Sequence, residues 1–429
     1  MSIDGENVLM NQNVLGPGIR LTEQELPDPS SDEGLASAVP VFIGWAGGVS
    51  ETGVMYRLFS PTDFPEEASK WPDCLRDCLT HYFDNGGSPC WVYVGHTPQG
   101  NDFSAGWTAF VNTARAALLG YASLTLVAVP QLVREVVSTE EKAIASTLVS
   151  AWKILLSAFA SRPDLFFVLD APSQTTATTA CIQAWRNDAS LSALGQRAAL
   201  YGPQLVTDYR NSKNSVPADT RVADGFRVLP PSAAVMGVYA RTDAAYGVWK
   251  APANDTLAHV VRPEFRETSA VDWFSDDRAS VNLIRSFAGR GTRVWGCRTL
   301  AGDGVALHRY VQVRRTLSWI EANLKEVCRF AVFEPNSLIT WYQLQGLCRA
   351  WLRRLWLEGG LAGADEASAF SIRVGLGESM TADDITAGNL VVDVAVALLT
   401  PAEFINVTLV LQVGNQQVSQ TTVSGDPLS

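Results

Sequence analysis

Short apolar runs alternate with longer amphipathic segments from residue 39 to about residue 205. The short runs are rich in Val, Phe, Tyr and Trp, which is typical of strands buried on both faces. The longer segments have helical character. We expect strands at 39–45, 90–95, 124–130, 165–171 and 198–205, with helices at roughly 71–84, 104–119, 139–161 and 175–190. This alternation predicts a mainly parallel sheet with helices on both faces.

The pattern changes after this region. Residues 206–229 are rich in Asn, Ser and Pro and predict a polar loop. A helix of mostly small residues should follow, opened by Pro230 and Pro231 and ended by Gly247. Small side chains would let another backbone approach this helix closely. Arg241 and Asp243 lie two positions apart, so we expect each to meet a partner elsewhere.

Strands, helices and further strands are expected in the rest of the chain. Strand-like runs at 281–285 and 292–299 are joined by a Gly-Arg-Gly turn, and 306–329 and 337–358 carry apolar residues at helical spacing. Arg314 and Arg315 should lie on the outer side of the first of these helices, and Asn336 is placed to cap the second. Alternating Val and Leu at 370–374, 390–399 and 406–413 predict antiparallel β structure.

Four separated motifs resemble the signature of contractile tail sheath proteins, the family of phage tail sheaths, contractile bacteriocins and extracellular contractile injection systems. The most specific is the contiguous Gly-Val-Trp-Lys-Ala-Pro-Ala-Asn at 247–254. The others are Gly-Arg-Gly at 289–291 leading to Trp-Gly-Cys-Arg-Thr at 295–299, Phe-Glu-Pro-Asn at 333–336, and Pro-Ala-Glu-Phe-Ile at 401–405. The resemblance is strongest over 230–413 and weak over 36–229.

Pattern and resemblance together predict a fold of mixed class, α/β and α+β. We expect an N-terminal linking arm at 1–35, a variable α/β domain with a mainly parallel sheet at 36–229, an α+β sheath core domain at 230–400, and a C-terminal strand and linking arm at 401–429. A length of 429 residues fits two to three domains.

The resemblance implies a structural subunit of a contractile sheath and not an enzyme. Six copies would form a ring around an inner tube, rings would stack helically, and contraction would drive the tube through a target envelope. The implied partners are further copies of the chain or sheath isoforms, the inner tube protein, and baseplate and cap proteins. The particle would assemble in the bacterial cytoplasm and act after release or while attached to a cell. A phage virion sheath is the alternative. Phage versions frequently carry large inserted outer domains, whereas this chain has only about 190 residues before the signature region at 230–254, which favours the more compact injection-system type.

Three groups of residues are candidates for assembly. The arms are too extended to bury their own apolar residues, so they are either disordered or add strands to a neighbour's sheet, and the resemblance favours the second. The junction between domains would be held by Gly247, Trp249, Pro252 and Asn254. The inner tube would be gripped by Arg349, Arg353 and Arg354, for which a solvated face is the alternative. The candidate inter-subunit strand residues are Val8, Leu9, Met10, Val14, Leu15, Phe404, Ile405, Val407, Leu409 and Leu411.

Composition and charge limit the classes of partner and ligand that this chain could bind. A net charge of −11 disfavours nucleic acid. No apolar run is long enough for a membrane span, and the acidic N-terminus is unlike a signal peptide. Seven scattered cysteines indicate folding in a reducing compartment. Cys74, Cys78 and His81 could supply three zinc ligands, but without an obvious fourth we prefer small residues on a helix face.

Catalytic patterns are scarce. Only four histidines occur, and no nucleophile elbow, zinc-protease helix or phosphate loop is present. The one candidate is Asp170, at the end of a predicted strand, where a nucleotide-dependent α/β enzyme would place a functional carboxylate. We prefer a local turn in which Asp170 accepts backbone N–H groups. No cofactor or metal is expected.

Overall fold

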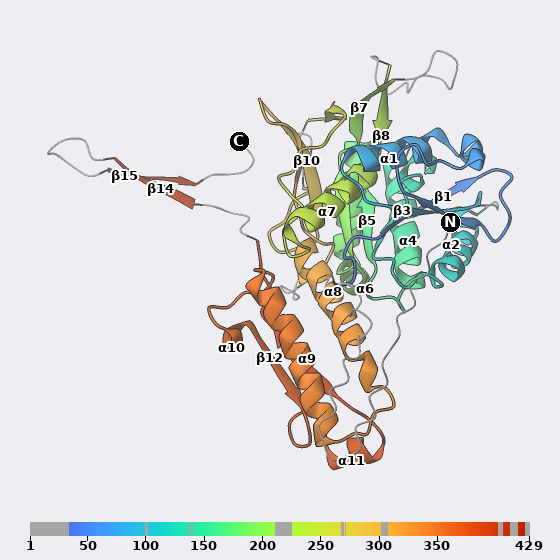
Figure 1. Cartoon of the computed structure of the whole chain (residues 1–429). Helices are drawn as coiled ribbons and strands as arrows, with labels where there is room; N and C mark the ends of the chain where they lie inside the picture. The colour runs from blue at the N-terminus through green and yellow to red at the C-terminus, as the bar shows by residue number, and fades with distance from the viewer. Residues whose placement is uncertain are drawn as a thin grey trace, which may run out of the picture. The chain divides into compact units, whose positions relative to one another are not determined.

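The computed structural model describes residues 34–98, 102–136, 138, 140–210, 225–266, 270, 272–301 and 308–401, with the backbone of two strands at 406–411 and 419–424. Its main feature is an eight-stranded sheet in the order β11-β10-β6-β5-β4-β1-β3-β2 (Figure 1). The six strands from β10 to β3 run parallel, and the two edge strands, β11 and β2, are antiparallel to their neighbours. The strands are β1 (Pro40–Ala46), β2 (Val54–Leu58), β3 (Cys90–His96), β4 (Leu126–Ala128), β5 (Phe166–Asp170), β6 (Ala198–Gly202), β10 (Val281–Phe287) and β11 (Gly291–Trp295).

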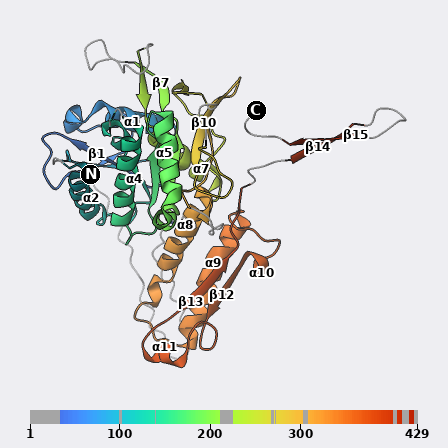
Figure 2. The ribbon, with the colours of Figure 1, turned by 180° about the vertical axis from the view of Figure 1, so that it is seen from behind.

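Helices cover both faces of this sheet (Figures 1 and 2). Alternate residues of β1 point to opposite faces, as a strand requires: Val41 and Ile43 join one apolar core, and Phe42 joins the other. The first core contains buried residues of α2, α4 and α5, and the second contains those of α1 and α7. The helices of this part are η1 (Glu66–Lys70), α1 (Asp73–Asp84), α2 (Phe103–Leu118), α3 (Leu132–Glu135), α4 (Glu141–Ala158), α5 (Thr175–Asn187), α6 (Ala189–Gly195) and α7 (Ser232–Tyr246).

A third apolar core lies among the elements from α8 to β13. Leu344, Cys348 and Leu352 of α9 form a buried stripe at four-residue spacing, and Phe370 and Ile372 of β12 pack with it. The elements are α8 (Val311–Val327), α9 (Leu338–Leu357), α10 (Glu366–Ala369), β12 (Phe370–Val374), α11 (Ala382–Thr386) and β13 (Val392–Val396). β12 and β13 form an antiparallel two-stranded sheet.

Two smaller β structures complete the described chain. β7 (Leu205–Arg210) pairs with β8 (Phe226–Leu229) and with β9 (Val260–Pro263) in a three-stranded sheet. β14 (Asn406–Leu411) and β15 (Ser419–Ser424) pair as an antiparallel ladder. None of the helices in the described part of the chain has the length and apolarity that a membrane-spanning helix needs.

The mixed α/β class and the mainly parallel sheet predicted from the sequence are confirmed. The prediction of a single strand at 198–205 is wrong. β6 ends at Gly202, and β7, which begins at Leu205, belongs to a different sheet. The expected loop at 206–229 is also wrong in part, since β7 and β8 occupy its two ends. The sequence analysis missed β2, a five-residue edge strand in which only Leu58 is buried. Strands from both sides of residue 229 share the large sheet, and the proposed domain boundaries stay predictions.

Candidate assembly surfaces

The N-terminus of α7 is held by a carboxylate from the large sheet. Asp170, the last residue of β5, accepts a hydrogen bond at Oδ1 from the backbone N–H of Ser232, 2.6 Å away. Asp170 is only 3% exposed, and burial raises its pKa to about 7, against the opposing effect of the Ser232 hydrogen bond. The prediction that Asp170 belongs to a local turn is therefore wrong in part. Asp170 does accept a backbone N–H, but that N–H belongs to a helix distant in sequence. It faces α7 and not an open cleft.

The small residues of α7 allow the close approach that the sequence predicts. A Cβ added at Gly237 would lie 2.6 Å from the carbonyl oxygen of Tyr82 in α1, closer than real contacts permit. The helix is buried along most of its length, from Ser232 to Ala240 and again at Thr242. The hydroxyl groups of Tyr239 in α7 and Tyr201 in β6 lie 2.6 Å apart and share a hydrogen bond. α7 is thus a central element of the core.

Asp243, near the end of α7, forms a buried ion pair with Arg315 of α8. The guanidinium makes two hydrogen bonds to the carboxylate, with Nη1–Oδ1 and Nη2–Oδ2 distances of 3.0 and 2.6 Å. Both side chains are nearly inaccessible, at 3% exposure for Arg315 and 5% for Asp243. Ser37 donates its hydroxyl hydrogen to the same carboxylate, and the guanidinium stacks 4.8 Å from the centre of the Tyr239 ring. The pair fastens α8 to α7.

The expectation that Arg314 and Arg315 face outward is wrong. Both are buried, and Arg314 donates a hydrogen bond to the carbonyl of Pro163, 3.0 Å away. Helical spacing places these arginines off the apolar stripe that faces α9, but it does not reveal that the large α/β part covers their side of α8. One sequence signal pointed to this ion pair: Asp243 has no oppositely charged residue at a suitable helical spacing in its own helix. Its expected partner elsewhere in the chain is Arg315.

The predicted junction residues lie where α7 leads toward α8 and β11. Gly247 has φ +91°, which only glycine adopts readily, and a Cβ there would lie 2.3 Å from the ring of Trp249. Trp249 is half-buried and tilts against Trp319 of α8, with ring centres 6.4 Å apart. Pro252 is buried. Trp249 thus joins the exit of α7 to the third core.

The same segment ends along the edge of the large sheet. The N–H of Asn254 donates to the carbonyl of Val294 in β11, 2.7 Å away, and the N–H of Leu257 donates to the carbonyl of Thr292, 2.9 Å away. Asn254 itself has φ +62°, a left-handed conformation that asparagine tolerates. Arg293 donates to the Asn254 carbonyl, 2.5 Å away. These contacts fix the 247–254 segment at both ends, as its proposed role as a junction requires.

The three arginines proposed to grip the tube lie on the exposed side of α9. Arg349 and Arg353 both approach Glu366, at 3.5 and 3.7 Å, and Arg354 pairs with Glu358 at 3.0 Å. Their side chains are 50–62% exposed, so these pairs are weak and exchangeable. α9 contains no Asp or Glu. The exposed side of α9 also carries large apolar residues, namely Leu338, Ile339, Tyr342, Leu347 and Leu357.

The structure leaves most of the proposed inter-subunit strand residues undescribed. Those of the N-terminal arm, together with Phe404 and Ile405, lie outside the described residues. Val407, Leu409 and Leu411 belong to β14, of which only the backbone is described. Leu35, the last residue of the expected arm, contacts α8: it donates its N–H to Asn323, 2.8 Å away, and its carbonyl accepts from the Trp319 indole. Leu35 is thus bonded to the helix that carries Arg315.

Two other sequence predictions find different partners. Asn336 does not cap α9; its side chain bonds to the carbonyl of Asn389 and accepts from the indole of Trp341, at 2.9 and 2.6 Å. His81 points to the carbonyl of Ala258, with Nε2 2.9 Å away, and burial lowers its pKa to about 4. Within the described residues, no group of three or more His, Cys, Asp or Glu side chains could hold a metal ion. Cys74, Cys78 and His81 thus do not form the alternative zinc site.

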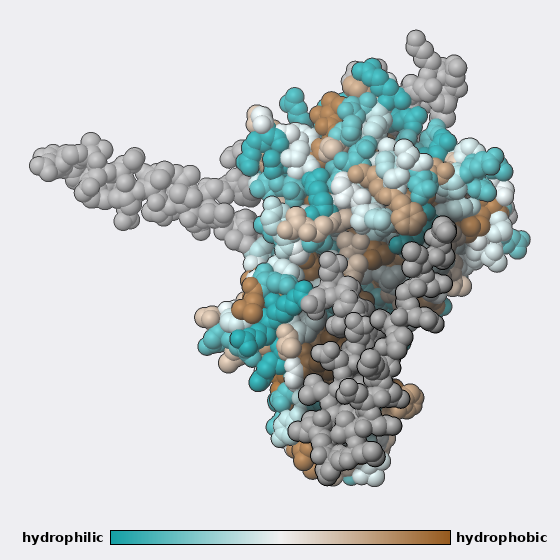
Figure 3. Space-filling view, viewed as in Figure 1, coloured by the Kyte–Doolittle hydropathy of each residue, from teal (hydrophilic) through white to brown (hydrophobic). Residues whose placement is uncertain are grey.

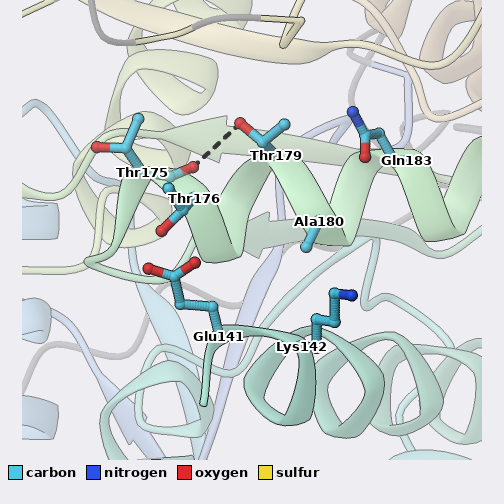
Figure 4. Close-up of a pocket in the computed structure, with 7 residues that line it drawn as sticks. All are labelled: Glu141, Lys142, Thr175, Thr176, Thr179, Ala180 and Gln183. Atoms are coloured by element: carbon cyan, nitrogen blue, oxygen red, sulfur yellow. Dashed lines mark hydrogen bonds between the residues drawn. The ribbon is translucent and has the colours of Figure 1, made fainter. Parts of the chain in front are cut away.

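A hollow of about 380 Å³ lies between the first turn of α4 and residues 175–183 of α5 (Figure 4). Glu141 and Lys142 line it from α4, and the hydroxyl of Thr179 is already bonded to the carbonyl of Thr175 within α5. Asp170 is not among its lining residues, which are Glu141, Lys142, Thr175, Thr176, Thr179, Ala180 and Gln183. The hollow therefore gives no support to the nucleotide-dependent alternative. Elsewhere, the face in Figure 3 is a mosaic of hydrophilic and hydrophobic residues.

Comparison with known proteins identifies the family. Residues 306–412 match the model of the phage tail sheath C-terminal domain. A chain of the anti-feeding prophage (AFP) baseplate in the contracted state is 31% identical, with a TM-score of 0.76 over 94% of this chain and 100% of that one. The AFP helical sheath in the contracted state is 27% identical, with a TM-score of 0.68 over 93% and 99% of the two chains.

A third solved structure extends the likeness. The PVC sheath complex of an extracellular contractile injection system, in the contracted state, is 28% identical, with a TM-score of 0.67 over 95% of this chain and 99% of that one. No curated protein sequence matches the chain at a significant level. The chain belongs to the family of contractile tail sheath proteins and matches the sheath subunits of contractile injection systems along nearly its whole length.

Proposed function

We propose that this chain is the structural subunit of the contractile sheath of an extracellular contractile injection system. The observation that carries the proposal is the likeness to the PVC and AFP sheaths over 93–95% of the chain, which includes both the large sheet and the third core. Copies of the chain form rings of six, the rings stack helically around an inner tube, and baseplate and cap proteins meet the two ends. The particle assembles in the cytoplasm and acts outside the cell or at its surface.

The exposed side of α9 is the surface that meets the tube. It combines three arginines with exposed apolar residues and has no carboxylate of its own between Leu338 and Leu357. A tube surface with acidic groups around an apolar patch is its complement. Glu366 and Glu358 neutralise the arginines before docking, and their exposed ion pairs exchange for those of the tube at little cost.

The β12–β13 sheet is the acceptor for arms from neighbouring subunits. Among the described residues only β12 and β13 form this sheet, so each strand has an outer edge available for pairing. One face is covered: Phe370 and Ile372 are buried against α9. An added strand makes roughly four to six backbone hydrogen bonds, each worth about 1 kcal/mol net. One arm is a modest link, whereas two arms per subunit form a mesh that holds rings together while the globular parts move.

The attachment of the arm suggests how that mesh transmits force. Leu35 is bonded to Trp319 and Asn323 of α8, and Ser37 is bonded to the Asp243–Arg315 pair. A pull on the N-terminal arm therefore acts on the point where α7 and α8 are fastened together. The extended sheath is a kinetically trapped state, and contraction brings the globular parts of adjacent rings into contact.

Removal of residues 1–20 tests this function. The shortened chain should fold, because the described cores begin after residue 34, and should remain as protomers when the full chain sediments as large assemblies. Circular dichroism and sedimentation velocity measure the two properties. Large assemblies formed by the shortened chain would contradict the role of the arm.

A further inference from the structure

Two cysteines from different helices lie side by side in the third core. Cys328, at the end of α8, and Cys348, in the middle of α9, have their sulfur atoms 3.6 Å apart. Both are free thiols. A disulfide needs the sulfurs about 2.05 Å apart, a further approach of roughly 1.5 Å. Cys328 is the residue at which α8 ends, directly before the short 3-10 helix Arg329–Ala331.

The two thiols differ in accessibility and acidity, and this difference favours thiol–disulfide exchange that starts at one of them. Cys348 is fully buried, whereas Cys328 is partly accessible. The contact with the Cys348 thiol lowers the pKa of Cys328 to about 7. The same contact, together with burial, raises the pKa of Cys348. The accessible cysteine is thus the one that ionises first, and the buried one stands ready behind it.

The other cysteines do not share this arrangement. Cys74 and Cys78 also contact each other, but they lie four residues apart on α1, so a bond between them would not join two helices. The pKa of buried Cys78 is raised well above its usual value, through the Cys74 contact and burial. Burial raises the pKa of Cys181 to about 12 and also raises that of Cys90.

We propose that Cys328 and Cys348 form an oxidation site, which closes to a disulfide when the protein meets a low-molecular-weight disulfide such as oxidised glutathione. The Cys328 thiolate attacks one sulfur of the small disulfide, forms a mixed disulfide and expels one small thiolate. The Cys348 sulfur then attacks the Cys328 sulfur of the mixed disulfide and expels the second small thiolate, which takes up the Cys348 proton. Two protein thiols are oxidised, and one small disulfide is reduced to two thiols.

The bond would join α8, which carries the Asp243–Arg315 fastening, to α9, which carries the proposed tube surface. A particle that forms in a reducing cytoplasm and is released into an oxidising medium would gain this link after assembly. That setting rests on the proposed function, but the chemistry does not. Thiol chemistry on the full chain in its unpolymerised form is therefore informative whether or not the protein forms sheaths.

The test is incubation of the native full chain with oxidised glutathione, followed by denaturation, thiol titration and peptide mass mapping. We expect free thiols to fall from seven to five, with the intact chain lighter by two hydrogen atoms and one bridged peptide joining Cys328 to Cys348. Seven remaining thiols, or a bridge between other cysteines, would overturn the proposal.

Two single variants test the order of the steps. Cys348→Ser should accumulate a glutathione adduct at Cys328, because no second thiol resolves it. Cys328→Ser should keep all six of its thiols, because the buried Cys348 is inaccessible to the small disulfide. An adduct that persists at Cys328 of the unmodified sequence would show that Cys348 cannot reach it, and would also overturn the proposal. The measurement on the unmodified sequence stands even if a serine variant folds poorly.

Discussion

Asp243 of α7 and Arg315 of α8 form a two-bonded ion pair that is almost fully buried. The carboxylate and guanidinium meet at 2.6 and 3.0 Å, with the Ser37 hydroxyl on the same carboxylate. This one contact joins α7, which packs on the large sheet, to α8, which leads into the third core, and to Ser37, close to the expected arm at 1–35. It is the clearest physical link between the parts of the chain.

Asp243→Ala should destabilise the protein strongly, because Arg315 would remain buried without its counter-charge. Loss of one partner from a buried pair costs about 3–5 kcal/mol, measured as the free energy of unfolding in urea. Asp393→Ala is a matched control: Asp393 pairs with Arg373 at 3.2 Å, but both side chains are well exposed, so its loss should cost about 0–1 kcal/mol. Equal costs for the two variants would contradict the fastening role of Asp243.

Asp170 should make stability depend on pH. Its pKa is about 7 in the folded protein, against an ordinary value of 3.8. The folded chain therefore holds this proton over a range in which the unfolded chain has released it, and stability falls as pH rises from about 4 to about 7. The full effect is up to about 4 kcal/mol. Asp170→Asn keeps an oxygen acceptor for Ser232 but cannot titrate.

The comparison to make is the unfolding free energy of Asp170→Asn against the unmodified sequence between pH 4 and pH 8. The asparagine variant should gain relative stability steadily up to about pH 7 and no further above it. Parallel profiles for the two proteins would show that Asp170 is ionised in the folded state throughout, and that the α7 N-terminus fully offsets its burial.

The junction should be sensitive to small changes at Gly247 and Trp249. Gly247→Ala meets both an unfavourable φ of +91° and the Trp249 ring, so we expect a loss of about 2–4 kcal/mol. Gly48→Ala is the control, because Gly48 has φ +77° but open space around it, and its cost should be only about 1–2 kcal/mol. Thermal unfolding measures both. If Gly247→Ala costs no more than Gly48→Ala, a clash with the Trp249 ring does not contribute to the loss of stability.

Trp249→Ala should cost about 2–4 kcal/mol, since the ring is half-buried against Trp319 and its loss leaves a cavity beside the third core. The measurement is the unfolding free energy, with near-ultraviolet circular dichroism to report the packing of the remaining tryptophans. A change below about 1 kcal/mol would mean that Trp249 does not hold the junction.

Reversal of the basic side of α9 should abolish binding to the tube without unfolding the subunit. Arg349→Glu, Arg353→Glu and Arg354→Glu together replace three exposed cations by anions, and their present ion pairs contribute little to stability. Arg329→Glu is the control, since Arg329 is 76% exposed at the end of α8 and lies outside this surface. Co-sedimentation with the inner tube protein is the assay. Unchanged co-sedimentation of the triple variant would exclude this surface as the attachment site.

The sequence predicted the large sheet and its helices well because buried strands and amphipathic helices impose local patterns. Predictions failed where a partner lies far away in sequence. The carboxylate that accepts the first N–H of α7 belongs to Asp170, 62 residues before Ser232, and nothing local to either residue identifies the other. Arg315 was expected at the surface because helical spacing reports one packed face, whereas α8 is packed on two. Trp249 and Gly247, by contrast, were found from a contiguous motif whose steric demands are local.

The most direct test of the sheath function is negative-stain electron microscopy of the full chain, expressed alone and together with its inner tube protein. We predict tubular polymers or six-fold cogwheel rings, with polymers of defined length in the presence of the tube. A preparation that folds, as judged by circular dichroism, yet stays as dispersed single protomers at high concentration with and without the tube would contradict the account.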